Sequence, residues 1–340
     1  MKSLLSGSSP RRTLFSVAAA LHCLTSWSAV HCFTLAHPAS PRTSSVSAPL
    51  MSSSVTTDTT PPSPISVMPG TSPIEDQPIR NPINDTSTIL IVGGTRSIGL
   101  EFVKQCLAKG ATVVATHRSE HLPSTLLDLQ GTYSSTSTSG HLFGLQMDLA
   151  DEESIRAAAL AYQSLNVSPL THIIHNAGIY RPETSFDGTP RGPRPSAPKV
   201  TKDAMMESFA INSIAPILVA QNFVSLCASN TTTSTSAVLP AWAFVSSKVG
   251  SVDDNGSGGA YAYRSSKAAL NQIAKSLSID LVGQASVVLL HPGYVKTDMT
   301  GGKGLIDTET SVGGMMKAIE ATDENVGFRF VDYKACLIPW

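Results

Sequence analysis

The sequence predicts one doubly wound α/β domain over residues 85–340, with a mainly parallel sheet of about seven strands and helices on both faces. Two patterns predict this fold class. Short apolar runs, typical of strands that are buried on both faces, alternate with longer segments of helical periodicity. The first unit, residues 88–116, runs strand, glycine turn, helix and strand, which is the pattern of a parallel βαβ crossover.

The remaining elements follow in order along the chain. Thr88–Val92 is the first strand, the helix from Leu100 stops at Gly110, and residues 111–116 form the second strand. Further strands are expected at 142–147, 171–175, 241–245 and, as the last one, 287–290. Further helices are expected over 151–163 and 201–228 and around Tyr263. Loops are expected at the Ser/Thr tracts 131–140 and 230–236 and at the Pro-rich stretch 181–198, which is long enough to be a lid or an edge of the pocket.

Residues 1–84 are expected to be a targeting presequence and a disordered linker. Basic residues precede an interrupted apolar run, 14–35, and a Ser/Thr/Pro-rich stretch with almost no acidic residue follows. Signal-like and transit-like segments in tandem resemble the bipartite plastid presequences of algae with secondary plastids, with Phe33 starting the transit part. Two alternatives stay open: a secretory signal with a linker, or a cytosolic form that starts at Met51. Because His and Ser interrupt the run, no stable membrane span is expected in the mature protein.

Composition narrows the class of partner. The formal net charge is −1 and charged residues make up 14% of the chain, so neither a nucleic-acid surface nor a solvated acidic tail is expected. The spacing of the five cysteines fits neither a metal site nor a disulfide framework, and no metal is predicted. A small polar or amphipathic molecule is the expected partner.

The glycine turn, residues 93–99, is a candidate dinucleotide site. Its glycines allow the backbone to approach a pyrophosphate that is held by unpaired N–H groups at a helix N-terminus. His117 stands at the end of the second strand, where an acidic residue would hold the ribose 2′-hydroxyl of NAD. Arg96 and Arg118 instead suit the 2′-phosphate of NADP. The sequence therefore predicts NADP(H) as cofactor.

Tyr263 and Lys267 form a candidate catalytic pair in the run Tyr-Arg-Ser-Ser-Lys. Four residues span about one helical turn, so both side chains point the same way from a helix. A nearby ammonium lowers the pKa of a phenol, and hydride transfer to a carbonyl needs a proton donor of this kind. Tyr261 lacks such a partner, because Ser265 follows it at this spacing.

These motifs resemble those of the short-chain dehydrogenase/reductase family over residues 88–340. The turn has the family's Gly-x-x-x-Gly-x-Gly spacing, with Ser97 at the middle glycine and Val92 in place of the preceding Thr. Ser97 puts a side chain beside the phosphates, and Val92 loses a structural hydrogen bond. The runs Asn-Ala-Gly at 176–178 and Pro-Gly-x-Val-x-Thr-Asp-Met from Pro292 also match. The Ile-Pro-Trp terminus is similar to the C-factor-like carbonyl-reductase branch.

The resemblance implies a Rossmann-type domain and a role for each matching residue. Ser247, three residues before Gly250, would hydrogen-bond the carbonyl oxygen, and Asn212 would hold a water that relays protons to Lys267. The implied catalytic set is Asn212, Ser247, Tyr263 and Lys267. The implied cofactor-binding set is Gly93, Arg96, Ser97, Ile98, Gly99, Arg118, Asp148, Asn176, Ala177, Gly178, Tyr263, Lys267, Pro292, Gly293, Val295 and Thr297.

The function expected from these residues is NADPH-dependent reduction of a ketone or aldehyde, or the reverse oxidation of the alcohol, with Tyr263 as proton donor. The alternative is a catalytically weak NADP-binding protein that acts in signalling or redox sensing. By analogy with the family, the helices around Asn212 and Tyr263 would form the face of a homodimer.

Overall fold

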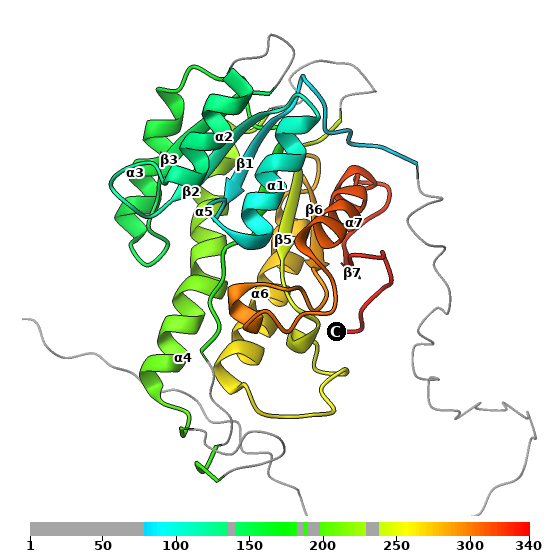
Figure 1. Cartoon of the computed structure of the whole chain (residues 1–340). Helices are drawn as coiled ribbons and strands as arrows, with labels where there is room; N and C mark the ends of the chain where they lie inside the picture. The colour runs from blue at the N-terminus through cyan, green and yellow to red at the C-terminus, as the bar shows by residue number, and fades with distance from the viewer. Residues whose placement is uncertain (1–77, 135–139, 182–185, 190–197, 229–237) are drawn as a thin grey trace, which may run out of the picture. The chain divides into compact units, whose positions relative to one another are not determined.

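One parallel sheet forms the centre of the fold in the computed structural model, which describes residues 78–340 except 135–139, 182–185, 190–197 and 229–237 (Figure 1). Seven strands lie in the order β3-β2-β1-β4-β5-β6-β7, and every neighbouring pair is parallel. The predicted doubly wound class is confirmed. The strands are β1 (Thr88–Val92), β2 (Thr112–His117), β3 (Leu142–Gln146), β4 (His172–His175), β5 (Ala241–Val245), β6 (Ser286–His291) and β7 (Arg329–Asp332).

Helices cover both faces of this sheet (Figure 1). Within β1, Ile89 and Ile91 join one core, whereas Leu90 and Val92 join the other. Successive side chains of a strand point to opposite faces, so a strand that is covered on both sides must be apolar throughout. One face carries α1 (Ser97–Ala108), α2 (Ser124–Ser134) and α7 (Thr308–Glu320), and the other carries α3 (Glu152–Gln163), α5 (Ala215–Phe223) and α6 (Tyr261–Asp280).

The strand order reverses between β1 and β4. The chain moves outward from β1 to β2 and β3, and then returns to the other side of β1 for β4 and the strands that follow. The loops that leave the carboxyl ends of β1 and β4 therefore diverge. Such a switch point opens a crevice at the carboxyl edge of the sheet, where ligands bind in folds of this class.

The predicted helix over 201–228 is not a continuous α-helix. α4 (Lys202–Phe209) runs into a π-helix, Ala210–Ile214, which is followed by α5 and by a 3-10 turn, Val224–Leu226. The whole stretch, Lys202–Leu226, is long and apolar enough to cross a membrane by length and composition alone. Core helices of soluble proteins meet the same criterion, and Val219 and Phe223 are buried in the second core.

Two further predictions change in the structure, and others fall on residues that the structure does not describe. The strand expected to be the last, at 287–290, is β6, and β7 follows it; β7 has only four residues, with Arg329 and Asp332 at its ends. α2 runs through Ser134, into the tract expected to be a loop from Gly131. Residues 1–77 of the expected presequence, the tract 230–236 and most of the stretch 181–198 lie outside the described residues.

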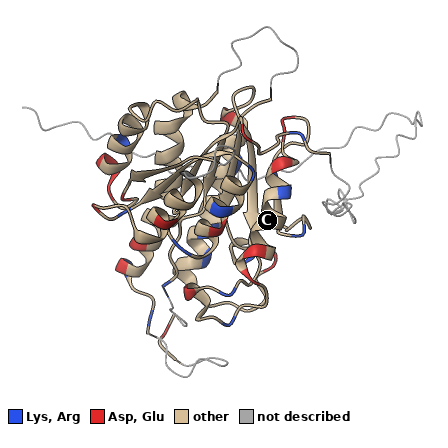
Figure 2. Cartoon of the chain, turned by 45° about the horizontal axis from the view of Figure 1, so that its top comes forward, with Lys and Arg blue, Asp and Glu red and all other residues tan. Residues whose placement is uncertain are grey.

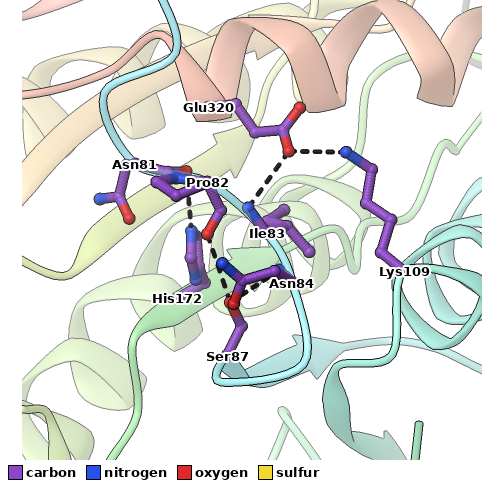
Figure 3. A network of polar contacts seen from close by, with 8 residues as sticks. All are labelled: Asn81, Pro82, Ile83, Asn84, Ser87, Lys109, His172 and Glu320. Carbon is purple, nitrogen blue, oxygen red and sulfur yellow. Dashed lines mark hydrogen bonds and ion pairs between the residues drawn. The ribbon is translucent and has the colours of Figure 1, made fainter. Parts of the chain in front are cut away.

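Residues 80–87 belong to the folded domain (Figure 3). The backbone N–H groups of Arg80 and Asn81 donate to the carbonyl oxygen of Glu320 over 2.8 and 2.9 Å. The Ile83 N–H donates to the Glu320 carboxylate over 3.1 Å, and Lys109 Nζ contacts the same oxygen at 2.6 Å. The Ile83 side chain is 4% exposed and joins the first core. The folded part therefore starts before residue 85, the boundary that the sequence predicts.

We expect Ile83→Ala to lower the free energy of unfolding by about 2–4 kcal/mol, because it removes buried apolar volume from the core. Ile79→Ala, at a side chain that is 67% exposed, should change it by less than about 0.5 kcal/mol. Urea denaturation of the two variants measures both values. Equal stabilities would show that residues 80–87 are not part of the cooperative fold.

Candidate active site

A cleft of about 910 Å³ lies where the chain leaves the carboxyl ends of β1 to β6. Most of the predicted site residues line it, which places segments that are far apart in the sequence around one space. The predicted residues in its lining are Gly93, Arg96, Ser97, Ile98, Arg118, Asp148, Asn176, Ala177, Gly178, Tyr263, Lys267, Pro292 and Thr297.

Other predicted residues lie behind this lining. A Cβ on Gly99 would overlap the Gly93 carbonyl oxygen, so only glycine allows this close packing of the turn. Asn176 Nδ2 donates to the same carbonyl over 3.1 Å and braces the turn. Gly293 has a φ of +83°, which favours glycine, and Val295 is buried just after it. Gly99, Gly293 and Val295 thus shape the cleft rather than face into it, whereas Asn176 both lines the cleft and braces the turn.

The N-terminus of α1 opens on the cleft with unpaired N–H groups. Its N-cap, Arg96, makes no side-chain capping bond, and the first turn of α1 holds no acidic residue. By contrast, the side chains of Asp151, Thr201 and Asp307 cap α3, α4 and α7. Free N–H groups and the positive end of the helix dipole fit an anionic pyrophosphate.

The glycine turn departs from expectation at one residue and is strained at another. The sequence predicts a lost hydrogen bond at Val92, but the Gly93 N–H donates to Thr116 Oγ1 over 2.9 Å, so the neighbouring strand supplies a hydroxyl. Ser97 has a φ of +47°. This left-handed conformation costs a non-glycine residue about 1–2 kcal/mol. The turn is therefore formed, with strain at its middle position.

Two arginines reach the cleft from the turn and from the end of β2. Arg96 Nη1 lies 3.9 Å from Asp298 Oδ2, and both side chains are mostly exposed. Arg118 is exposed and also lines the cleft, whereas His117 before it is buried, with Nδ1 2.9 Å from the Ser119 carbonyl oxygen. Charges of both signs are interspersed over the rest of the domain (Figure 2). Guanidinium groups at this rim fit a 2′-phosphate.

Tyr263 and Lys267 line the cleft, and Ser247, which is not part of that lining, lies beside Tyr263. Tyr263 and Lys267 lie one turn apart on α6, with Lys267 Nζ 5.8 Å from the centre of the Tyr263 ring. Ser247 Oγ accepts from the Val249 N–H over 3.4 Å and lies near enough to the Tyr263 phenol to lower its pKa. Lys267 is 3% exposed and donates to the Val245 carbonyl oxygen over 2.9 Å. A hydroxyl, a phenol and an ammonium thus meet at the end of β5.

The pKa of Tyr263 differs from the expectation that Lys267 lowers it. Burial raises this pKa to about 12. The nearby Ser247 side chain opposes the increase, and the negative charge of Tyr180 in its phenolate form adds to it. Burial also lowers the pKa of Lys267 to about 8. The phenol is therefore protonated at neutral pH, and the lysine still carries its charge there.

Asn212 lies in the π-helix, fully buried, and its side chain joins two other segments. Oδ1 accepts from the Ile179 N–H over 2.8 Å, and Nδ2 donates to the Ile179 carbonyl oxygen over 2.9 Å and to Ser266 Oγ over 3.0 Å. A Cβ on Gly178 would lie 3.2 Å from Asn212 Oδ1 and 3.3 Å from Lys267 Nζ. Asn212 and Lys267 therefore both lie next to Gly178; the water relay between them stays a prediction.

The middle residues of the Tyr-Arg-Ser-Ser-Lys run have structural roles that the sequence alone does not indicate. The Ser266 carbonyl oxygen accepts from Ser213 Oγ over 2.7 Å, which ties α6 to the π-helix a second time. Arg264 Nη1 donates to the Val249 carbonyl oxygen over 3.1 Å, and Nη2 donates to Ser257 Oγ over 2.7 Å. Arg264 thus fastens the loop that follows Ser247. The only signal for these roles in the sequence is that polar residues, a guanidinium and hydroxyls, stand between Tyr263 and Lys267.

We expect Ser97→Gly to raise the free energy of unfolding by about 0.5–1 kcal/mol, because glycine adopts a positive φ without steric cost. Ser276→Gly, at an exposed position within α6, should lower it by about the same amount. Urea denaturation compares the two. A loss of stability in both variants would contradict the strain assigned to Ser97.

Comparison with known proteins places this geometry in a family. Residues 87–305 match the family model described as short chain dehydrogenase. The C-signal of Myxococcus xanthus is 39% identical over 145 residues, which is 40% of this chain and 78% of that protein.

Solved structures agree with this assignment. A carbonyl reductase from chicken fatty liver, solved with NADPH bound, is 32% identical, with a TM-score of 0.63 over 74% of this chain and 98% of its own. The carbonyl reductase Sniffer of D. melanogaster is 28% identical, with a TM-score of 0.65 over 75% of this chain and 99% of its own. The chain therefore belongs to the short-chain dehydrogenase/reductase family.

Proposed function

We propose that this protein is an NADPH-dependent oxidoreductase that reduces a ketone or aldehyde, or oxidises the corresponding alcohol. The observation that carries the proposal is the place of Tyr263 and the buried Lys267 in the cleft, one helical turn apart, with Lys267 Nζ 5.8 Å from the centre of the Tyr263 ring and Ser247 beside the phenol. This group of side chains provides a proton donor, a hydrogen-bond partner for an oxygen and a fixed positive charge in one cleft.

The α1 N-terminus, Arg96 and Arg118 would hold the dinucleotide, which supplies the hydride when it is bound. Both arginines line the cleft, and no acidic side chain stands at the end of β2. The related carbonyl reductases from chicken fatty liver and from Pseudomonas aeruginosa were solved with NADPH and NADP, respectively, which supports the same cofactor here.

Tyr263 would donate its proton to the oxygen of the carbonyl group. Its raised pKa, about 12, keeps the phenol protonated at neutral pH, and an alkoxide is a much stronger base than a phenolate. The Ser247 hydroxyl would hydrogen-bond the same oxygen. The Lys267 ammonium, with a pKa near 8, would stabilise the phenolate that remains after the transfer.

A catalytically weak signalling or sensing role is the second candidate. The 39% identity to the C-signal of Myxococcus xanthus favours it, and so does the strained Ser97 beside the phosphate-binding turn. NADPH binding without turnover of any carbonyl compound would support this role over that of a reductase.

We also propose that the segment before the domain directs the protein to a plastid. The support is its composition: a basic start, an interrupted apolar run and a Ser/Thr/Pro-rich continuation. A fluorescent protein fused behind residues 1–77 should enter the plastid of an alga with a secondary plastid. Retention in the secretory pathway, or a cytosolic signal from a product that starts at Met51, would contradict the proposal.

We expect Tyr263→Phe to remove nearly all turnover and to leave NADPH binding within about twofold of the unchanged protein, because only the donated proton is lost. Tyr261→Phe, two residues earlier on α6 and exposed, is the matched control and should keep full activity. NADPH oxidation with a panel of carbonyl compounds, together with a fluorescence titration of NADPH, measures both properties. A Tyr263→Phe protein that still turns over would refute Tyr263 as the donor.

A further inference from the structure

The loop that leaves β4 is fastened at two points to one helical stretch. At the first point, the N–H and carbonyl groups of Ile179 both hydrogen-bond the side chain of Asn212, over 2.8 and 2.9 Å. At the second point, Arg181 Nε donates to Glu207 Oε2 over 2.8 Å, and Nη2 donates to the other carboxylate oxygen. Glu207 lies on α4 and Asn212 on the π-helix that continues it.

Tyr180 lies between the two fastened residues and contacts the proposed proton donor. Its ring stands edge-on to the Tyr263 ring, with centroids 5.2 Å apart and an interplanar angle of 88°. Edge-to-face contacts of this kind are favourable and directional. Because a Tyr side chain has few rotatable bonds, the hydrogen bonds at Ile179 and Arg181 largely fix where the Tyr180 ring can be.

We propose that Tyr180 is a positioning residue for Tyr263, and that the Arg181–Glu207 ion pair together with Asn212 holds Tyr180 in place. The inference rests on the proposed role of Tyr263 as proton donor. The ring of Tyr180 limits the orientations of the phenol beside Ser247 and excludes water from one side of it. Proton transfer is sensitive to both, because a small displacement of a donor lowers the rate steeply.

The contributions of the two attachments differ. Asn212 is fully buried, and its bonds to Ile179 are shielded from water. The side chains of Arg181 and Glu207 are about half exposed, so their ion pair is screened by water and contributes less. Loss of the ion pair should therefore loosen Tyr180 only in part, whereas loss of the Tyr180 ring should remove the contact altogether.

The test compares variants of the full chain by kcat, KM, NADPH affinity and the pH dependence of kcat. Tyr180→Ala should lower kcat about 3- to 10-fold, the size of one aromatic contact, with NADPH affinity within about twofold. Water that enters beside the phenol lowers the pKa of Tyr263, so the alkaline fall in the reduction rate should move to lower pH. Tyr180→Phe keeps the ring and should restore kcat; because it removes the Tyr180 phenol, whose charge helps to raise the pKa of Tyr263, the pH profile should return only in part.

Glu207→Gln tests the attachment without a change in the core. It should lower kcat about 2- to 3-fold, because the ion pair holds the loop only in part. The matched control is Glu153→Gln. It breaks a comparable exposed ion pair with Arg156 on α3, neither of which lines the cleft, and it should leave kcat unchanged. Since Glu207 is exposed, this variant also tests the proposal if Tyr180→Ala does not fold.

Two results would overturn the inference. One is a Tyr180→Ala protein with unchanged kcat and pH profile; the other, if that variant does not fold, is a Glu207→Gln protein as active as Glu153→Gln. The outcome is separate from that of the proposed function. If Tyr263→Phe is inactive and Tyr180→Ala is unaffected, Tyr263 remains the donor and the role of Tyr180 is lost. If Tyr263→Phe is active, Tyr263 is not the donor, and the part of the proposed function on which this inference rests fails.

Discussion

The site depends on the hydrogen bonds of one buried amide, that of Asn212. It joins the π-helix to the loop after β4 through Ile179 and to α6 through Ser266. These are the segments that carry Gly178, Tyr263 and Lys267, so the amide sets the distance between the loop and the candidate pair Tyr263 and Lys267. An unpaired amide at such a buried position would cost free energy of folding. The network therefore stabilises the fold and also favours this one arrangement of the three segments.

The topology of the sheet determines where the cleft beside this network opens. Reversal of the strand order at β1 and β4 opens the cleft, and the free N–H groups of α1 make its outer part suitable for phosphates. Two features of the cleft oppose stability: Ser97 has a positive φ, and the charged Lys267 is buried. The apolar cores on both faces of the sheet offset these costs.

The sequence was sufficient for the fold class and singled out fewer than half of the residues that line the cleft, because glycine spacing and the Tyr/Lys interval reflect local geometry only. It did not reveal the π-helix, since one widened turn hardly changes the apolar periodicity of residues 201–228. It also missed the short β7. Residues 80–84 were missed as part of the fold, because their place depends on tertiary contacts with Glu320. The raised pKa of Tyr263 follows from burial, which no spacing in the sequence indicates. The homodimer stays a prediction.

The central claim is that the cleft transfers a hydride from NADPH to a carbonyl carbon. The most direct test is turnover with NADPH that carries deuterium at C4 of the nicotinamide, followed by mass spectrometry of the alcohol. The account predicts one deuterium on the carbinol carbon when the transferred face is labelled, and none when the opposite face is labelled. Bound NADPH that yields no labelled alcohol from any carbonyl compound tested would contradict it.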